Sequence, residues 1–311
     1  MAHVFVTGGA GFIGSHTVDK LLAAGHAVTV ADNFRTGRRA NLAGALGSPR
    51  CRLLELDVAA PGVVASAIEE TKPDAIIHLA ALVSVQESMT DPELNYALNV
   101  RATHLVAEAA RLHGVKRLVF ASSAAIYGDA TDFPITERSD KKPISPYGAA
   151  KLASEALLLG HGAAFGLTVR CQRYFNVFGP RQDPASPYSG VISIFDRRYR
   201  DGKGVTIYGD GQQTRDFISV HDVARANVLA ATAPGIASGV ANICTGRATS
   251  LLDVVGVFAR HYPTAPAVVH GAPRLGDIIH SLGAADEAAA SLGFRAEVSV
   301  EAGLGELITT G

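Results

Sequence analysis

Tyr147 and Lys151 are the two residues of this sequence whose types and spacing best suit proton transfer. They stand four positions apart in a predicted helix, Pro146–Phe165, and therefore share one of its faces. A free phenol has a pKa of about 10 and is a poor base at neutral pH. A neighbouring ammonium group lowers that pKa because it stabilises the phenolate. The pair predicts a tyrosine base that is activated by a lysine.

Ser122 and Ser123 follow directly after a predicted strand, Arg117–Ala121. Parallel sheets bind their ligands at the carboxyl ends of the strands, and these hydroxyls fall at such an end. Ser123 is expected to hydrogen-bond a substrate hydroxyl and to share the charge that develops on it. A turn serine without a catalytic role is the alternative interpretation.

A glycine-rich segment, Thr7–Gly14, follows the first predicted strand, His3–Thr7. Its pattern is GxxGxxG, with one residue more between the first two glycines than the standard dinucleotide fingerprint has. Gly8 permits the tight turn, Gly11 lets the backbone approach a pyrophosphate, and Gly14 lets the next helix pack closely. The N-terminus of that helix directs free N–H groups at the phosphates. The segment predicts a dinucleotide site.

Asp32 and Asn33 end the second predicted strand, Ala27–Ala31, about twenty residues further on. A carboxylate there accepts hydrogen bonds from the adenosine ribose and repels a 2′-phosphate, which favours NAD over NADP. Asp57, after the third strand, could reach the adenine edge or be an ordinary turn residue. Three nearby arginines can accommodate a 2′-phosphate and keep NADP as the alternative: Arg35, Arg38 and Arg39.

The elements that must position these residues alternate along the chain. Short apolar runs, continuous rather than alternating, are typical of parallel strands buried on both faces. They cover His3–Thr7, Ala27–Ala31, Arg52–Leu56, Ala75–His78, Arg117–Ala121 and Leu167–Arg173. Helical patterns between them include Gly14–Ala24, Glu93–His113 and Pro146–Phe165. The alternation predicts an α/β fold with a doubly wound parallel (Rossmann) sheet.

The pattern changes after residue 176, where Pro and Gly become frequent over 179–190. We predict a Rossmann domain over residues 1–176, to which later strands near 205–245 return. Residues 177–311 are expected to form mainly a smaller mixed domain that closes over the carboxyl edge of the sheet and binds substrate.

Composition narrows the class of protein. The chain has 311 residues and a formal net charge of −1, which argues against nucleic acid or an anionic membrane as the main partner. It shows no secretory leader pattern and no apolar stretch of roughly 20 residues. Its cysteines (Cys51, Cys171 and Cys244) form no CxxC pair, so neither a disulfide framework nor a zinc site is expected. We expect a soluble cytoplasmic protein without a metal.

The chain resembles, over essentially its whole length, the extended short-chain dehydrogenase/reductase family, and within it the NAD-dependent UDP-sugar 4-epimerases. Besides the residues above, the resemblance rests on motifs spread along the sequence. They are TGGAGFIGSH at 7–16, HLAA at 78–81, YFNVFGP at 174–180, YGDG at 208–211, QTRDF at 213–217 and RLGD at 274–277.

The resemblance implies which residues bind NAD and which bind a UDP-sugar. Those implied for NAD are Gly8, Gly11, Phe12, Ile13, Gly14, Asp32, Asn33, Asp57, Val58, Leu79, Ala80, Ala81, Asn99, Ser122, Tyr147, Lys151 and Tyr174. Those implied for the UDP-sugar are Ser123, Tyr147, Asn176, Val191, Tyr208, Arg215, Arg274, Asp277 and Ser281. Arginines suit the diphosphate because they form charge-assisted bonds with phosphate. The resemblance also implies a homodimer through the helices near 93–113 and 146–165.

Ala124 and Ala125 stand where the dehydratases and decarboxylases of the resembling family carry an acid. What remains is a Ser–Tyr–Lys set with NAD, which is sufficient for reversible hydride transfer. The expected reaction is inversion of C4 of a UDP-hexose, of the UDP-glucose/UDP-galactose 4-epimerase type. The alternatives are a C4 epimerase of UDP-glucuronate or UDP-N-acetylglucosamine, a net dehydrogenase, and a non-catalytic NAD-binding protein.

Ser281 bears on the width of the sugar pocket. In the resembling epimerases restricted to plain hexoses, a bulky tyrosine tends to stand at this place. A serine leaves room for about an acetamido group, so a bulkier or modified UDP-hexose is expected to be handled as well as UDP-glucose. The alternative is that Ser281 caps a following helix. Arg181 is the nearby candidate cation for a uronate.

Overall fold

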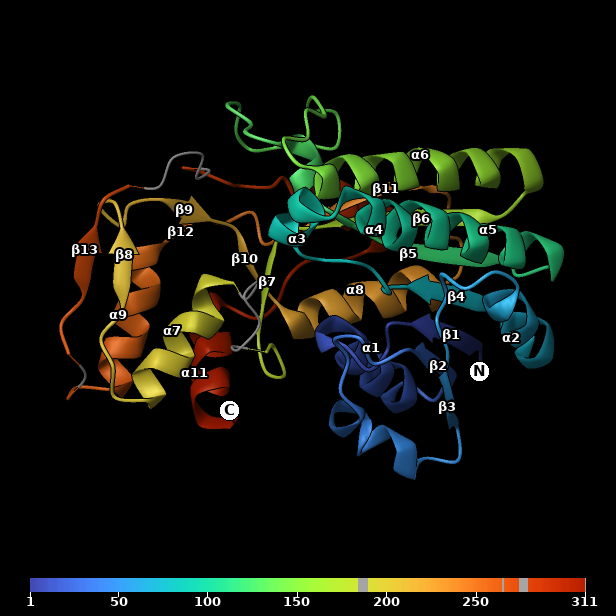
Figure 1. Ribbon diagram of the computed structural model, residues 1–311, viewed down its shortest axis with the longest axis horizontal. Helices are drawn as coiled ribbons and strands as arrows, with labels where there is room; N and C mark the ends of the chain where they lie inside the picture. Colours follow the sequence, from blue (N-terminus) through green and yellow to red (C-terminus); the bar gives the residue numbers. More distant parts are fainter. Residues whose placement is uncertain (184–189, 265, 274–278, 311) are drawn as a thin grey trace.

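The larger part of the molecule is a parallel sheet with helices on both faces (Figure 1). The computed structural model describes residues 1–183, 190–264, 266–273 and 279–310. Seven strands of the described residues build this sheet, and every neighbouring pair is parallel. In spatial order they are β11 (Gly239–Ile243), β6 (Thr168–Tyr174), β5 (Arg117–Ser123), β4 (Ala75–His78), β1 (His3–Thr7), β2 (Ala27–Asp32) and β3 (Cys51–Glu55). The predicted doubly wound α/β fold is confirmed.

The continuous apolar strands serve two cores, one on each face of the sheet. In β1, Val4 and Val6 pack into one core and Phe5 into the other, and all three are fully buried. The first core lies under α1 (Phe12–Ala23), α8 (Val220–Thr232) and α10 (Asp286–Leu292). The second lies under α2 (Val63–Thr71), α5 (Ala102–Leu112) and α6 (Pro146–Phe165).

The predicted helix Glu93–His113 is not continuous. It consists of α4 (Pro92–Asn95), a π-helical turn over Tyr96–Arg101, and α5. The carbonyl of Asn99, inside the widened turn, accepts hydrogen bonds from the hydroxyls of Thr103 (2.5 Å) and Ser154 (3.1 Å). These hydroxyls satisfy a buried carbonyl where the regular helical ladder is interrupted.

The smaller part of the molecule combines helices with two-stranded sheets (Figure 1). Its helices are α7 (Val191–Arg200), α9 (Leu251–His261) and α11 (Val300–Thr310). Its strands pair as β7 (Asn176–Phe178) with β10 (Phe217–Ser219), β8 (Thr206–Tyr208) with β13 (Val269–Gly271), and β9 (Thr214–Arg215) with β12 (Thr249–Ser250). Tyr199 stacks on Phe258 and Tyr262, with ring centroids 5.2 and 5.7 Å away, and so joins α7 to α9.

The strands between residues 205 and 245 have different destinations. β11 joins the main sheet beside β6, whereas β8, β9 and β10 pair within the small sheets. The short elements α3 (Val85–Thr90) and the 3₁₀ turns Arg39–Leu42, Ala45–Gly47 and Ala124–Tyr127 complete the described structure. Within the described ranges, no helix is long and apolar enough to cross a membrane.

Candidate active site

The predicted site residues converge at the carboxyl ends of the central strands. β1 ends in the glycine segment, β4 leads into Leu79–Ala81, and β5 ends at Ser122 and Ser123. Tyr147 and Lys151 lie in the first turns of α6, which packs on β5 and β6. The structure therefore brings the candidate base, the two serines and the glycine segment to one edge of the sheet, as a parallel-sheet site requires.

The glycine segment can be built only without side chains at two of its positions. Gly8 has a φ of +67°, and a Cβ there would lie 2.7 Å from the Ala80 nitrogen. A Cβ on Gly14 would lie 2.1 Å from the Gly8 carbonyl oxygen. Gly11 is the N-cap of α1 and makes no side-chain hydrogen bond to the helix. The first backbone N–H groups of α1 therefore stay available to bind a phosphate group.

Asp32 is held against the glycine segment. Its carboxylate accepts hydrogen bonds from the backbone N–H of Ala10 (2.9 Å) and Phe34 (2.8 Å). Burial raises the pKa of Asp32, and these two hydrogen bonds oppose the rise. The arrangement keeps a carboxylate at the end of β2, beside the loop that receives the pyrophosphate in dinucleotide-binding folds.

The arginines that kept NADP open have other partners. Arg35 pairs with Glu87 and Arg38 with Asp183, while the Arg39 guanidinium lies 5.8 Å from the centroid of the Phe34 ring. Two of the three cations are thus neutralised by acids of the same chain. This favours NAD, the first of the two predicted cofactors.

Tyr147 is positioned by the capping of its helix. Ser145 is the N-cap of α6, with its hydroxyl accepting a hydrogen bond from the Gly148 N–H, and Pro146 follows as the first helical residue. The Tyr147 N–H donates to the hydroxyl of Ser88 at 3.1 Å. Burial raises the pKa of its phenol, and the side chain of Ser123 opposes that rise.

Lys151 points toward the strand rather than toward the phenol. Its Nζ donates to the Ala121 carbonyl at 2.8 Å and lies 4.8 Å from the ring centroid of Phe120, but 5.8 Å from that of Tyr147. Burial lowers the pKa of Lys151 to about 7.

The expected lowering of the pKa of Tyr147 by Lys151 stays a prediction. Burial raises the pKa of Tyr147, and the group that opposes this rise is the hydroxyl of Ser123.

Ser122 supplies an unused hydrogen-bonding group at the site. Its Oγ is buried and has no hydrogen-bond partner among the described residues. Buried polar groups are almost always paired, so an orphaned hydroxyl at the carboxyl end of β5 indicates a polar ligand group there. A bound dinucleotide fits three features of this edge: the free N-terminus of α1, the tightly packed glycine segment and the hydroxyl of Ser122.

The other residues predicted to bind NAD either pack against the glycine segment or lie in the turns after β2 and β3. The backbone N–H groups of Leu79 and Ala80 donate to the Thr7 hydroxyl, which keeps 79–81 against the glycine segment. Asn33 and Asp57 accept hydrogen bonds from N–H groups two residues further on, and Val58 is buried.

Asn99 and Tyr174 use their polar atoms within the protein. The Asn99 amide accepts a hydrogen bond from the Leu82 N–H and donates one to the Leu82 carbonyl. The Tyr174 hydroxyl donates to Asn227 of α8 at 2.6 Å. Their role in binding NAD stays a prediction, and the observed hydrogen bonds are structural.

The predicted substrate residues of the smaller part surround β9. Arg215 donates to the carbonyls of Thr214 (2.9 Å) and Ile279 (3.3 Å), and the Ser281 N–H donates to the Thr214 carbonyl (3.1 Å). Asn176 is exposed at the start of β7. Val191 begins α7, and Tyr208, in β8, is exposed; Arg274 and Asp277 lie outside the described residues.

One alternative interpretation of this region is wrong, and one candidate residue has a partner within the chain. Ser281 does not cap a helix: it lies in an extended segment that bridges to β9, and α10 begins at Asp286. Arg181, the candidate cation for a uronate, pairs with Asp19 of α1 at 2.8 Å. The sequence did not reveal either contact, because each joins residues that are far apart along the chain.

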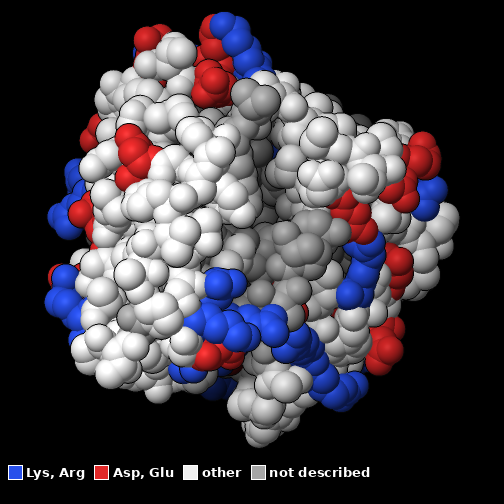
Figure 2. Space-filling view, turned by 60° about the vertical axis from the view of Figure 1, so that its left-hand side comes forward, with Lys and Arg blue, Asp and Glu red and all other residues white. Residues whose placement is uncertain are grey.

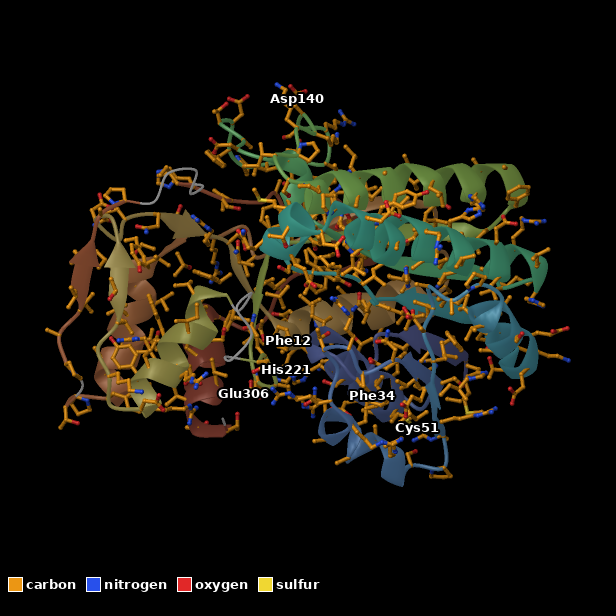
Figure 3. All side chains as sticks on the ribbon, viewed as in Figure 1. Phe12, Phe34, Cys51, Asp140, His221 and Glu306 are labelled. Atoms are coloured by element: carbon orange, nitrogen blue, oxygen red, sulfur yellow. The ribbon has the colours of Figure 1, made fainter. Side chains whose placement is uncertain are left out.

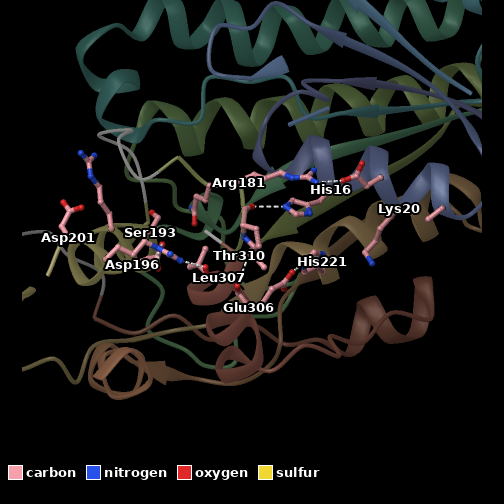
Figure 4. Close-up of a pocket in the computed structure, with 16 residues that line it drawn as sticks. His16, Lys20, Arg181, Ser193, Asp196, Asp201, His221, Glu306, Leu307 and Thr310 are labelled. Atoms are coloured by element: carbon pink, nitrogen blue, oxygen red, sulfur yellow. Dashed lines mark hydrogen bonds and ion pairs between the residues drawn. The ribbon is translucent and has the colours of Figure 1, made fainter. Parts of the chain in front are cut away.

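A separate cavity of about 710 Å³ lies between α1 and helices α7 and α11 (Figure 4). His16, whose ring shares a 2.9 Å hydrogen bond with the Pro180 carbonyl, has its pKa lowered to about 4 by burial. His221 pairs with Glu306 beside it (Figure 3). None of the predicted catalytic residues lines this cavity.

On the face seen in Figure 2, Lys and Arg side chains gather in a band across the lower part of a hollow.

Sequence reasoning missed a buried ion pair behind the site, between Glu155 of α6 and Arg173 of β6. A signal was present in the sequence: Arg173 is a charged residue within an apolar strand, and Glu155 follows Lys151 by four positions. No group of three or more potential metal-ligating side chains occurs among the residues that the structure describes.

The parallel sheet, its glycine loop and the Ser–Tyr–Lys edge define an NAD-binding Rossmann enzyme. The chain belongs to the NAD dependent epimerase/dehydratase family, whose model matches residues 4–244. It is 36% identical over 304 residues to the UDP-glucose 4-epimerase of Mycolicibacterium smegmatis, covering 97% of this chain and 96% of that protein.

Solved structures of two other epimerases are similar over nearly the whole chain. One is the UDP-glucose 4-epimerase of Thermus thermophilus in complex with NAD, at 37% identity and a TM-score of 0.89, covering 99% of this chain and 98% of that one. The other is the UDP-N-acetylglucosamine 4-epimerase of Methanobrevibacter ruminantium in complex with UDP-N-acetylmuramic acid, at 34% identity and a TM-score of 0.93. It covers 99% of this chain and 97% of that one.

Proposed function

We propose that this chain is an NAD-dependent 4-epimerase of UDP-hexoses. The observation that carries the proposal is the meeting of Tyr147, Ser123 and the glycine segment at one edge of the sheet, with alanines at 124 and 125. The relatives that share this fold over nearly the full chain are named as UDP-sugar 4-epimerases and support the same reaction. The experiment that tests the proposal is conversion of UDP-hexoses without added cofactor, read at C4.

The chain's own residues have distinct roles in this reaction. Tyr147 accepts the proton of the C4 hydroxyl, and Ser123 hydrogen-bonds that oxygen while charge develops on it. Lys151 holds the cofactor ribose and places a positive charge at the edge of the sheet. NAD, when bound, would supply the hydride acceptor for C4 and the hydride donor for the return to the sugar. The 4-keto sugar stays in the closed site between these events.

NAD is held by the glycine segment and Asp32 in this proposal. Exchanging the carboxylate in Asp32→Asn keeps one acceptor for the loop N–H groups but removes the charge that repels a 2′-phosphate. We expect the preference for NAD over NADP to fall by about tenfold or more. The measurement is the affinity of the apoprotein for each dinucleotide. Asp74→Asn, an exposed carboxylate at the amino end of β4 and therefore at the opposite edge of the sheet, is the matched control and should leave the preference unchanged.

The sugar of the natural substrate is set, in our proposal, by the space beside Ser281. One similar solved structure is that of a UDP-N-acetylglucosamine 4-epimerase, and the serine at position 281 of this chain is small. Ser281→Tyr should lower kcat/KM for UDP-N-acetylglucosamine by about tenfold or more, because the ring fills the space for the acetamido group, and should spare UDP-glucose. Ser281→Ala adds no bulk and should spare both sugars. If Ser281→Tyr lowered kcat/KM equally for both sugars, Ser281 would not be part of the sugar pocket.

We further propose a cytoplasmic homodimer with residues 177–311 as the main substrate-binding part, and with neither nucleic acid nor a membrane as partner. Large apolar side chains are exposed on the two helices implied in the dimer and on the turn between α4 and α5. These are Tyr96 (52% exposed), Leu112 (61%) and Phe165 (55%). Exposed apolar side chains of this kind are what a second copy of the chain would cover.

A further inference from the structure

A buried ion pair lies one helical turn behind the catalytic residues. Arg173 donates to Glu155 through two nitrogens: Nε to Oε1 at 2.9 Å and Nη2 to Oε2 at 2.7 Å. The two residues are only 3% and 2% exposed, respectively. Burying such a pair has a high desolvation cost, and an apolar pair of similar size is often as stable. Stability alone therefore gives a weak reason for this pair.

The pair connects α6, the helix of Tyr147 and Lys151, with β6, the strand beside the two serines. Glu155 follows Lys151 by four positions in α6 and thus lies on the same helical face. Arg173 lies in β6 directly opposite Ser122 of β5, in the register that also places Ser123 opposite Tyr174. A rigid two-bond contact between Glu155 and Arg173 fixes the helix of the base relative to the strand of the serines.

The remaining donors of Arg173 reach the turn that follows Ser123. Nη1 donates to the hydroxyl of Tyr127 at 2.8 Å and to the carbonyl of Glu137 at 3.2 Å. Tyr127 ends the 3₁₀ turn Ala124–Tyr127, and its hydroxyl donates to Asn242 of β11 at 2.6 Å. One guanidinium group thus holds the helix of Tyr147, the turn after Ser123 and the loop at 137.

The same network extends to the segment that carries Ser281. The Asn242 amide donates to the Ile135 carbonyl at 2.9 Å. The Ile135 N–H in turn donates to the carbonyl of Leu282 at 2.8 Å, and Ile135 bridges to Gly283. A displacement of Arg173 would therefore shift both the catalytic groups and the segment of Ser281, which we propose as a wall of the sugar pocket.

Glu155 is also the negative charge that acts on Lys151. Burial lowers the pKa of Lys151, and the carboxylate of Glu155 opposes that effect. In β4, burial and then the charge of Lys151 lower the pKa of His78 to about 3, so this histidine is neutral at assay pH. The charged and titratable groups around Lys151 and Glu155 are Tyr147, His78, Arg173, Tyr127, Cys171 and Lys141.

We propose that Glu155 and Arg173 are positioning residues of the epimerase site: Arg173 aligns the helix of Tyr147 with Ser123, and Glu155 keeps Lys151 an ammonium group. The proposal rests on the proposed function for its kinetic effects. Its central statement, the control of the charge of Lys151, concerns the protein alone and can be measured without turnover.

The two halves of the pair predict opposite signs. Glu155→Gln removes the carboxylate that faces Lys151, so the pKa of the lysine should fall by about one unit. Arg173→Gln leaves that carboxylate without its partner, so the same pKa should rise by about one unit. The pKa is read from the Cε resonance of Lys151 in holoenzyme that carries ¹³C-labelled lysine, with Lys151→Met to assign the signal.

Kinetics give the second readout. The alkaline limb of the kcat–pH profile should move down in Glu155→Gln and up in Arg173→Gln. In the double variant, which has no carboxylate, it should stay at the position of Glu155→Gln. Tyr127→Phe keeps the ion pair but releases the turn after Ser123, so it should lower kcat about tenfold without moving the limb. It also tests the positioning role if a single charge variant does not fold.

Shifts of the same sign in both single variants, or no shift of the Lys151 resonance, would reduce the pair to a packing element and overturn the proposal. If Tyr127→Phe keeps the wild-type kcat, the positioning role of Arg173 is wrong. A wild-type protein without epimerase activity would refute the proposed function instead, and the NMR titration would still decide the role of the pair.

Discussion

Tyr147→Phe is expected to bind NAD and the UDP-sugar as the wild-type protein does and to lose kcat by about a thousandfold. The substitution removes one hydroxyl, whose pKa is raised by burial and lowered by the side chain of Ser123, at the edge of the sheet where ligands bind. The helix cap, formed by Ser145 and the Tyr147 backbone, does not depend on the phenol oxygen. The loss should therefore appear in kcat and leave KM and bound NAD nearly unchanged.

Tyr96→Phe is the matched control for this experiment. Tyr96 is half exposed in the π-helical turn and takes no part in the proposed chemistry, so its variant should keep the wild-type rate. Turnover is measured with saturating UDP-sugar, and bound cofactor by its release on heating. A Tyr147→Phe protein that kept more than about a tenth of the wild-type kcat would show that another group is the base.

Gly14→Ala is expected to abolish NAD binding and to lower the free energy of unfolding by about 2 kcal/mol. An added Cβ would lie 2.1 Å from the Gly8 carbonyl oxygen and 2.7 Å from the Gly9 Cα, both backbone atoms of the loop. The helix must then move away from the loop, and its N–H groups no longer meet the pyrophosphate. Denaturant unfolding and dinucleotide titration measure the two effects.

Gly160→Ala makes the same change in a helix with open space. Gly160 lies in α6, and its added Cβ would meet nothing within 4 Å outside the helix's own backbone. Because alanine favours helices over glycine, this control should be neutral or more stable by up to about 1 kcal/mol. If Gly14→Ala retained NAD and behaved like Gly160→Ala, the glycine segment would not be the dinucleotide cradle.

The sequence was sufficient to predict the parallel sheet and the edge of it at which the site lies. The apolar runs at His3–Thr7 and Ala75–His78 are strands with the predicted bounds, because buried parallel strands need apolar residues on both faces. The helix Pro146–Phe165 was equally clear from its Ser-Pro start and its Gly166 end. The π-helical turn around Asn99 was not predictable, since one extra residue per turn leaves the apolar pattern nearly unchanged.

Details of the site depend on contacts that spacing does not encode. The four-residue interval places Tyr147 and Lys151 on one face, but the Ala121 carbonyl decides where the ammonium group points. The neutralisation of Arg35 and Arg38 depends on Glu87 and Asp183, which are distant in the sequence. In the same way, the pairing of Arg181 with Asp19 appears only when the two parts of the molecule are brought together.

The most direct test is incubation of the purified protein with UDP-glucose, UDP-galactose, UDP-N-acetylglucosamine and UDP-glucuronate, without added cofactor. Proton NMR of the sugar ring reports the configuration at C4. We predict that at least one of these sugars converts to its C4 epimer until the two forms reach equilibrium, with no net consumption of NAD. A protein that leaves C4 unchanged in all four, or that accumulates a keto sugar with stoichiometric NADH, would contradict the proposed function.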